Sequence, residues 1–392
     1  MANKYTLSGT RRFEFIDALR GLAALGVLLV HSIQHCGSIH ALIPGITSSG
    51  LRGVQLFYIL SALTLFLSLE ERYKKDKYPF ISFFVRRFFR IAPLFYVVII
   101  INFIIKGYSA RYWAPEGISN FDFFSAFIFL NAWIPNAITS VVEGGWSVAI
   151  EMNFYALIPF LYKKIKGINS ALSLTLISYI FLALILSGLL YSFSSLIVSK
   201  DTLYLYKDYF HTFWLPAEFF VFMTGICLFF LLKQELISEA EENNLNSVFL
   251  KHLRTYIWQY YLFVSCFIAT LVIYGISSKF LWTCSFSLLI ILLSLKPVKV
   301  IVNPFTILIG KFSYSIYLLH FFVLGYIDKI LINLPFINKL MGDSTIFISM
   351  FKVGYIFTVA LSGVLIISYI TYYIIEKNGI RLAKQITVSL NK

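Results

Sequence analysis

Residues 17–32 read DALRGLAALGVLLVHS and place two ionisable side chains, Arg20 and His31, inside an apolar run. The run extends over residues 15–35, which is about the length that a helix needs to cross a lipid bilayer. Side chains eleven positions apart on an α-helix point in almost the same direction. They are separated by about 16 Å along the axis. This stretch therefore predicts a transmembrane helix with a basic group and a histidine on one face.

The composition indicates that the rest of the chain is also embedded in a membrane. Apolar residues make up 59% and charged residues 13% of the 392 residues. Soluble domains carry about a quarter charged residues. The apolar runs are continuous and do not alternate, which excludes a membrane β-barrel. We therefore predict an all-α, polytopic transmembrane helix bundle that forms one domain over residues 1–392, without an appended soluble domain.

Ten spans are expected, and two of them are long enough to be tilted, broken or extended beyond the bilayer. The predicted spans are 15–35, 53–69, 88–106, 146–163, 171–193, 210–232, 256–275, 278–295, 304–332 and 346–375. A further apolar stretch, 121–134, is short, and we expect a re-entrant or interfacial segment there.

The distribution of basic residues predicts the orientation of the bundle. With a cytoplasmic N-terminus, 21 of the 33 lysines and arginines fall on the inner side and 7 on the outer side. Cytoplasmic loops carry this excess in membrane proteins. We therefore expect both termini in the cytoplasm, and the long segment 107–145, where function is expected, on the outer side.

Ionisable groups inside a span cost at least about 2.5–3.5 kcal/mol each on insertion scales and usually mark functional sites. Asp17 is placed three residues before Arg20 and can pair with it. His31 is a candidate for chemistry, and the alternative is an interfacial histidine that caps its helix. His31 and His35 have the spacing of a metal pair, but no third ligand is evident, so no metal site is predicted.

Arginines cluster where the third span leaves the cytoplasm, in the sequence FFVRRFFRIAP. Arg86, Arg87 and Arg90 are spaced to line up along one helix. One interpretation is anchoring at the headgroups. The other is a phosphate clamp, because guanidinium groups bind phosphate in a bidentate manner. Together with Arg20, such a clamp predicts a cationic pocket for an anionic cofactor.

Polar residues also recur in later spans. Ser147 and Glu151 are spaced by one helical turn at the outer end of the fourth span, where Glu151 is either a functional group or a buried strut. Tyr317 and His320 share a face of the ninth span. For His320, a hydrogen bond to a neighbouring helix is as plausible as chemistry.

These segments together resemble the acyltransferase family 3 of integral membrane acyltransferases over essentially the whole chain. The residues that carry the resemblance are Asp17, Arg20, Gly21 and His31; Arg87 and Arg90; Trp146, Ser147 and Glu151; Glu218; and Ser313, Tyr314, Tyr317 and His320. The sequence departs from the family pattern at Gln55, where an acid is usual, at Ala62, where glycine is usual, and at Asn378, where proline is usual. The first departure leaves the role of that position open.

The resemblance implies transfer of an acyl group, usually acetyl, from cytoplasmic acyl-CoA to a hydroxyl of a cell-surface or lipid-linked polysaccharide. Members of the family modify glycans such as lipopolysaccharide O-antigen and peptidoglycan at a bacterial inner membrane. Acyl-CoA is then a donor substrate, and no permanently bound cofactor or nucleic acid is expected. The roles that follow are catalysis for His31, Glu151 and Asp17, donor binding for Arg20, Arg87 and Arg90, and substrate binding for Trp146, Ser147, Tyr317 and His320.

Two other classes of membrane protein share some of these features. A polysaccharide polymerase or flippase is also polytopic and basic, but it does not need arginines at the cytoplasmic edge opposite a histidine. A proton-coupled transporter would use His31, Glu151, Glu218 and His320 as a relay. Whether an acyl-histidine intermediate forms is open on the sequence alone.

Overall fold

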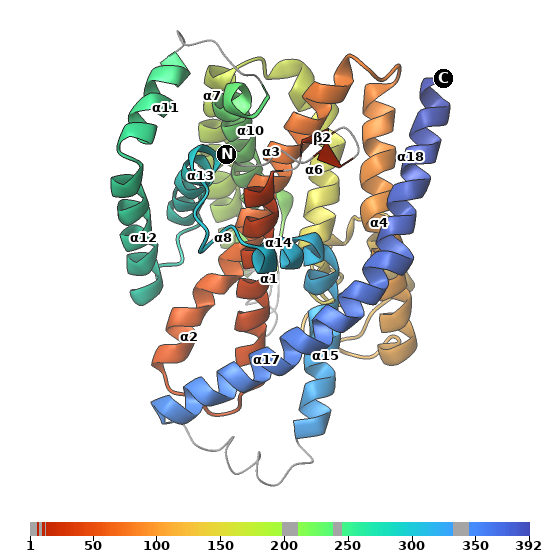
Figure 1. Cartoon of the computed structure of the whole chain (residues 1–392). Helices are drawn as coiled ribbons and strands as arrows, with labels where there is room; N and C mark the ends of the chain where they lie inside the picture. The colour runs from red at the N-terminus through yellow and green to blue at the C-terminus, as the bar shows by residue number, and fades with distance from the viewer. Residues whose placement is uncertain (1–5, 8–9, 12, 198–210, 238–244, 332–344) are drawn as a thin grey trace. The chain divides into compact units, whose positions relative to one another are not determined.

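The computed structural model describes residues 6–7, 10–11, 13–197, 211–237, 245–331 and 345–392. Residues 210 and 332, at the ends of two predicted spans, lie outside this part of the chain. The described residues are mostly helical, as predicted (Figure 1). The strands in this part of the chain are β1 (Thr6–Leu7) and β2 (Thr10–Arg11), which pair in an antiparallel manner.

The chain divides into two compact units, each described by itself. Unit 1 comprises Met1–Leu60 and Leu231–Leu365, and unit 2 comprises Ser61–Phe230 and Ile366–Lys392. The helices of unit 1 are α1 (Glu14–Ile33), α2 (Leu42–Thr47), η1 (Ser48–Arg52), α11 (Leu245–Thr255), α12 (Ile257–Ile273), α13 (Lys279–Leu295), α14 (Pro304–Lys311) and α15 (Ser313–Leu331). Those of unit 2 are α4 (Pro79–Lys106), α5 (Asn120–Phe127), η2 (Asn131–Trp133), α6 (Gly145–Lys164), α7 (Ile168–Ile177), η3 (Ser178–Leu186), α8 (Ser187–Ile197), η4 (Tyr372–Glu376) and α18 (Lys377–Asn391). Three helices have residues in both units: α3 (Gly53–Tyr73), α10 (Leu215–Ile237) and α17 (Ile346–Thr371).

Fewer helices than predicted have the length and hydropathy of a membrane span. Within the described residues six do so: Glu14–Ile33, Leu42–Tyr73, Pro79–Lys106, Ile168–Phe193, Leu215–Lys233 and Ile346–Asn391. Two bent helix pairs raise the number to as many as eight. All ten predicted segments contain helix. Helix α13 is not counted as a span because it has only 17 residues, and α6 is not counted because Glu151 and Asn153 make it more polar. The predicted count of ten spans is therefore corrected to six to eight candidates.

The long predicted spans are broken or extended, as their length suggested. The predicted span 304–332 is broken, because Pro304–Lys311 and Ser313–Ile327 meet at an angle of 76°, and the predicted span 346–375 lies within the longer helical stretch Ile346–Asn391. A further bend of 82°, between Val248–Thr255 and Ile257–Ile273, lies at the start of the predicted span 256–275. Asn303 caps α14 by accepting hydrogen bonds from the backbone of Phe305 and Thr306. This cap fixes the start of α14, and the bend follows at the other end of α14, before Ser313.

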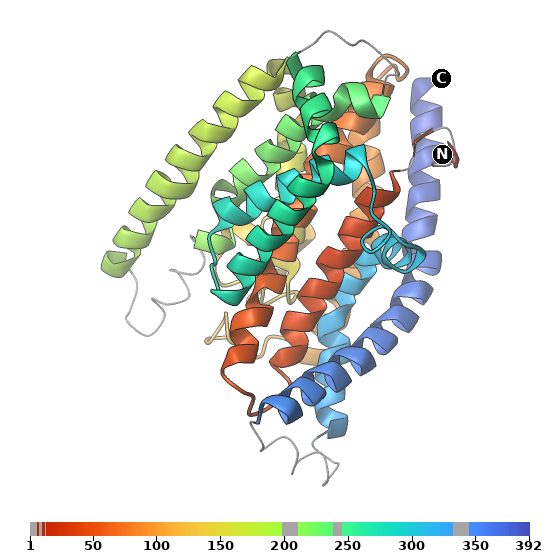
Figure 2. The same ribbon diagram turned by 60° about the vertical axis from the view of Figure 1, so that its left-hand side comes forward.

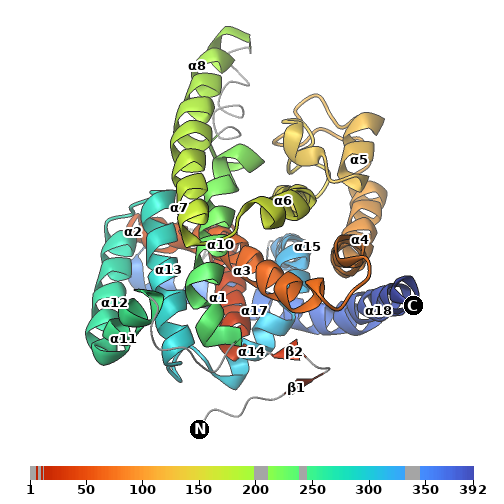
Figure 3. The same ribbon diagram turned by 90° about the horizontal axis from the view of Figure 1, so that it is seen from above.

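In unit 1, helix α1 packs closely against the short helix α14 (Figure 1). A Cβ atom on Gly310 would collide with the carbonyl oxygen of Asp17, and one on Gly21 would collide with the carbonyl oxygen of Thr306. Small residues allow helix backbones in membranes to approach in this way. Helices α12 and α13 lie side by side (Figure 3), and the Tyr261 hydroxyl donates to the Lys296 carbonyl at 2.7 Å.

In unit 2, helix α18 runs along α4. Gly379 lies against the carbonyl of Phe89, and the Asn391 side chain accepts from the Tyr78 amide at 3.1 Å. Figure 2 shows α7, η3 and α8 as one continuous helix. Apolar side chains on it are exposed, including Phe181 at 58%. A soluble protein rarely exposes such a surface, whereas lipid covers it in a membrane.

Candidate active site

His31 lies in the last turn of α1, which is uninterrupted from Glu14 to Ile33. Arg20 and His31 therefore stand on one helix, as predicted, and both side chains are half-buried. The His31 Nδ1 atom lies 3.2 Å from Oε1 of the exposed Gln34 side chain. Because an amide oxygen only accepts, the Nδ1–H group donates in this contact. The basic nitrogen of the neutral His31 ring is then Nε2.

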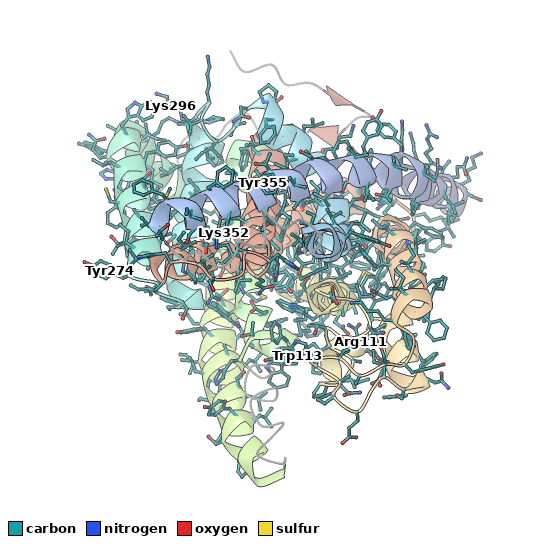
Figure 4. All side chains as sticks on the ribbon, turned by 90° about the horizontal axis from the view of Figure 1, so that it is seen from below. Arg111, Trp113, Tyr274, Lys296, Lys352 and Tyr355 are labelled. Atoms are coloured by element: carbon teal, nitrogen blue, oxygen red, sulfur yellow. The ribbon has the colours of Figure 1, made fainter. Side chains whose placement is uncertain are left out.

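The segment that follows His31 is tied to α17. The Lys352 ammonium, which is almost fully buried, donates to the Ser38 carbonyl, and the His40 amide donates to the Ser349 hydroxyl at 2.9 Å. Figure 4 labels Lys352 on this helix. Both contacts fix the chain just beyond the end of α1 and so limit the freedom of the turn that carries His31.

His320 lies next to His31, although 289 positions separate them in the sequence. The two ring centroids are 5.2 Å apart, and Phe321 contacts both rings at 4.5 and 4.1 Å. The His320 Nδ1–H group donates to the Tyr317 carbonyl at 2.6 Å. The Tyr317 ring in turn packs edge-on against Phe57. The structure thus places His31 next to His320, which the sequence predicted on one face of another span together with Tyr317.

The other two predicted residues of unit 1 lie at the opposite end of α1. Asp17 and Arg20 are half-buried where α1 crosses α14. Their pairing and their roles remain predictions.

The three arginines of α4 in unit 2 have different surroundings. Arg86 donates to Asp76 at 3.0 Å, whereas the Arg87 guanidinium lies 6.0 Å from the ring centroids of Phe83 and Tyr155. Arg90 is half-buried. The sequence could not separate these three roles, because all three arginines have helical spacing and the same charge.

Glu151 on α6 accepts two hydrogen bonds from residues that the sequence did not single out. The donors are the hydroxyls of Ser61 on α3 and Tyr155, one turn further along α6. Because Arg87 lies beside the Tyr155 ring, these residues form a polar path through unit 2 from the arginine to the carboxylate. The i, i+4 spacing of Glu151 and Tyr155 was a signal that could have identified the tyrosine.

Trp146 and Ser147 begin α6 and are buried. The Ser147 hydroxyl donates to the Gly144 carbonyl at 3.1 Å, and Trp146 packs edge-on against Phe213 at 4.8 Å. Trp113, from the predicted outer segment, packs against the same phenylalanine at 5.2 Å. Trp113 and Trp146 thus share one aromatic cluster.

The segment between α4 and α6 is held by polar contacts. Arg111, labelled in Figure 4 together with Trp113, donates to the carbonyls of Ser140 and Gly107, and Lys106 pairs with Glu143. Burial lowers the pKa of the Arg111 guanidinium, and the nearby Glu143 carboxylate partly opposes this effect. A long loop with such anchors presents a fixed surface.

Two positions that depart from the family pattern are inside the protein. Gln55 and Ala62 on α3 are 2% and 0% exposed. Across the described ranges, no group of three or more His, Cys, Asp or Glu residues is placed to hold a metal ion.

Comparison with known proteins gives a family match over most of the chain. The acyltransferase domain family matches residues 13–373. O-acetyltransferase OatA of Staphylococcus aureus is 26% identical over 195 residues, which cover 44% of this chain and 29% of the relative. Peptidoglycan O-acetyltransferase OatA of Listeria monocytogenes is 28% identical over 169 residues, which cover 40% and 25%. Acyltransferase MdmB of Streptomyces mycarofaciens is 27% identical over 165 residues, which cover 40% and 41%.

The chain therefore aligns with less than half of the length of each of these relatives. No solved structure matches it.

Proposed function

Because the chain belongs to acyltransferase family 3, we propose that it is a membrane-bound O-acyltransferase that acts on a glycan hydroxyl. The acyl group, usually acetyl, comes from acyl-CoA on the cytoplasmic side. The acceptor is a cell-surface or lipid-linked polysaccharide on the other side of a bacterial inner membrane. The observation that carries this proposal is His31, a half-buried imidazole in the last turn of α1, with a second histidine beside it.

His31 acts as the general base in this proposal. Imidazole titrates near neutral pH, which suits removal of a proton from a hydroxyl. The hydroxyl oxygen forms a bond to the acyl carbon while its proton passes to His31 Nε2. The bond between the acyl carbon and sulfur breaks, and the departing thiolate of CoA takes up the proton. An acyl-histidine intermediate is a second route that the same residue could serve.

Arg87 and Arg90 of unit 2 bind the phosphates of acyl-CoA. The Arg87 guanidinium lies 6.0 Å from the ring centroids of Phe83 and Tyr155, so aromatic side chains flank it on α4 and α6. Guanidinium groups bind phosphate through two parallel hydrogen bonds. Arg86 is less suited, because it already pairs with Asp76.

The acceptor is inferred from the relatives and from the aromatic cluster. The Listeria relative is named for peptidoglycan O-acetylation, and both OatA relatives are O-acetyltransferases. In the present chain, Trp113 and Trp146 lie around Phe213, and Ser147 lies beside Trp146. We assign Trp146 and Ser147 to the binding of the glycan, and Glu151 with Asp17 to the orientation of the reacting groups.

The test is acyl transfer in membrane vesicles that contain the protein. Acetyl-CoA labelled in its acetyl group is added at the cytoplasmic face, and label in the polysaccharide fraction is measured. We expect His31→Ala to lower transfer by about 10²–10⁴-fold, which is the usual contribution of a general base. His35→Ala, one turn further along the chain, is the matched control and should keep most of the activity.

Two results contradict the proposal. Transfer by His31→Ala within tenfold of the wild type, at equal amounts of folded protein, excludes His31 as the base. An absence of labelled polysaccharide with the wild-type protein, combined with glycan export or proton-coupled uptake, would identify a flippase or a transporter instead.

A further inference from the structure

The position of His320 suggests a role beyond the substrate binding expected from the sequence. Its side chain is 1% exposed, and its Nε2 atom has no hydrogen-bond partner among the described residues. A buried polar atom without a partner costs free energy, so such an atom usually serves a purpose. The ring of His31 lies beside it, at a centroid distance of 5.2 Å.

The hydrogen bond to Tyr317 determines what the Nε2 atom can do. A carbonyl oxygen only accepts, so Nδ1 of His320 carries the hydrogen. In a neutral imidazole the other nitrogen then carries a lone pair. His320 therefore presents a fixed acceptor, in an apolar setting that includes Phe321.

The charged form of His31 can donate one hydrogen bond more than the neutral form. A neutral imidazole has one N–H group, and the contact with Gln34 already uses it. An imidazolium has two N–H groups, and the unpartnered acceptor His320 Nε2 belongs to a ring whose centroid is 5.2 Å from that of His31. An interaction that forms only after the proton has been taken up stabilises the transition state and not the ground state.

We propose that His320 is a positioning residue for His31 that accepts a hydrogen bond from the His31 imidazolium during acyl transfer. The proposal rests on the function proposed above and deepens it. When the acceptor hydroxyl attacks the acyl carbon, its proton moves to His31 Nε2. The new N–H group is shared between the acceptor oxygen and His320 Nε2 until the proton is passed to the thiolate of CoA. His320 itself gains and loses no proton in this cycle.

Three substitutions at position 320 test this role. In His320→Gln, the amide oxygen can take the place of Nε2 and accept from His31. In His320→Asn, the shorter amide can take the place of Nδ1 and donate to the Tyr317 carbonyl, but it cannot reach His31. His320→Leu removes both interactions. The Asn variant is thus the matched control for a purely structural role.

We expect His320→Gln to keep kcat within about tenfold of the wild type, and Asn and Leu to lower it by about 10²-fold. The KM for acetyl-CoA should change less than threefold in all three variants, because the proposed contact forms only in the transition state. Activity is compared per molecule of protein that remains monodisperse in detergent. Equal activity of all three variants, or higher activity of Asn than of Gln, would overturn the proposal.

A second measurement does not depend on the Gln variant. In the His31→Ala background, His320→Asn or His320→Leu should lower the residual rate by less than about twofold, because residues that act as a unit are not additive. A further loss of tenfold or more in that background would show that His320 acts independently and would also overturn the proposal. If wild-type protein transfers no acetyl group, it is the proposed function that fails, whereas failure of the present inference changes only the results at position 320.

Discussion

Arg86, Arg87 and Arg90 carry the same charge on one helix, and Arg86 pairs with Asp76 at 3.0 Å. We expect Arg87→Lys and Arg90→Lys each to weaken the apparent affinity for acyl-CoA by about 10–100-fold. An ammonium group cannot reproduce the bidentate geometry of a guanidinium on phosphate. Arg86→Lys is the control, because a lysine can replace its contact with Asp76. The rate of acyl transfer as a function of acetyl-CoA concentration measures all three.

High acetyl-CoA should recover part of the rate for Arg87→Lys and Arg90→Lys, but not for His31→Ala. A double variant with lysine at positions 87 and 90 that keeps the wild-type affinity would contradict the clamp. The two arginines would then be headgroup anchors, and the donor would bind elsewhere.

Glu151 and Tyr155 allow a second test at the residue scale. Tyr155→Phe removes one of the two hydroxyls that donate to Glu151, so the carboxylate loses a hydrogen bond worth about 1.5–3 kcal/mol. We expect acyl transfer to fall by about tenfold or more while the protein still folds. Tyr162→Phe is matched to it, since Tyr162 on the same helix donates to Glu70 at 2.7 Å.

Tyr162→Phe should lower thermal stability without lowering transfer per folded molecule. If both tyrosine variants lose stability and neither loses transfer, Glu151 is a structural strut and not part of the catalytic machinery.

The sequence identified individual residues of the candidate site, but it did not predict which of them contact each other. His31 and His320 were each conspicuous because an ionisable side chain is costly in a span. Their contact could not be inferred, because it depends on how α15 packs beside α1. Ser61 was missed for the same reason, since its bond to Glu151 joins two helices.

At the scale of elements, the crossing of α1 and α14 should be sensitive to a single methyl group. Gly310→Ala places a Cβ atom against the carbonyl oxygen of Asp17, a backbone atom that cannot move aside cheaply. Overpacking of this kind costs about 1–3 kcal/mol. We expect a lower midpoint of thermal unfolding in detergent for Gly310→Ala.

Gly354→Ala is the matched control on α17 of the same unit. A Cβ atom there meets nothing within 4 Å, and alanine favours a helix over glycine by about 0.8–1 kcal/mol. Its midpoint should be unchanged or higher. Equal midpoints for both variants would mean that the crossing is looser than the structure shows.

The elements also show where hydropathy alone misleads. The sequence predicted helix in every span. Helix α6, however, carries Glu151 and Asn153, and its mean hydropathy is therefore lower than that of a typical membrane span. The start of α14 had a local signal in Asn303 and Pro304, a capping residue followed by proline at the first helical position. The bend of 76° between α14 and α15 was not predicted by these two residues, because its angle depends on tertiary packing.

At the scale of the whole molecule, composition predicted a multi-pass membrane protein, which the helices and the family match support. Orientation rests on charge alone, with 21 basic residues assigned to the inner side and 7 to the outer side. The proposed direction of acyl transfer depends on this orientation, so it needs its own measurement.

Reporter cysteines can measure the orientation in intact cells. Glu116, in the segment between α4 and α6, and Lys75, between α3 and α4, are both exposed. Of the native cysteines, Cys266 and Cys284 are exposed and are first replaced by serine. Cys36 can stay, because it is buried and burial raises the pKa of its thiol to about 11, which leaves little reactive thiolate at neutral pH.

A membrane-impermeant maleimide should label Glu116→Cys in intact cells and Lys75→Cys only after permeabilisation. The reason is electrostatic: Lys74, Lys75 and Lys77 belong to a basic loop, and such loops stay in the cytoplasm. If Lys75→Cys is labelled from outside and Glu116→Cys is not, the arginines of α4 would face away from cytoplasmic acyl-CoA. Arg87 and Arg90 could then not bind a cytoplasmic donor for transfer to an outer glycan. This conclusion would hold whatever effect His31→Ala has on the rate of transfer.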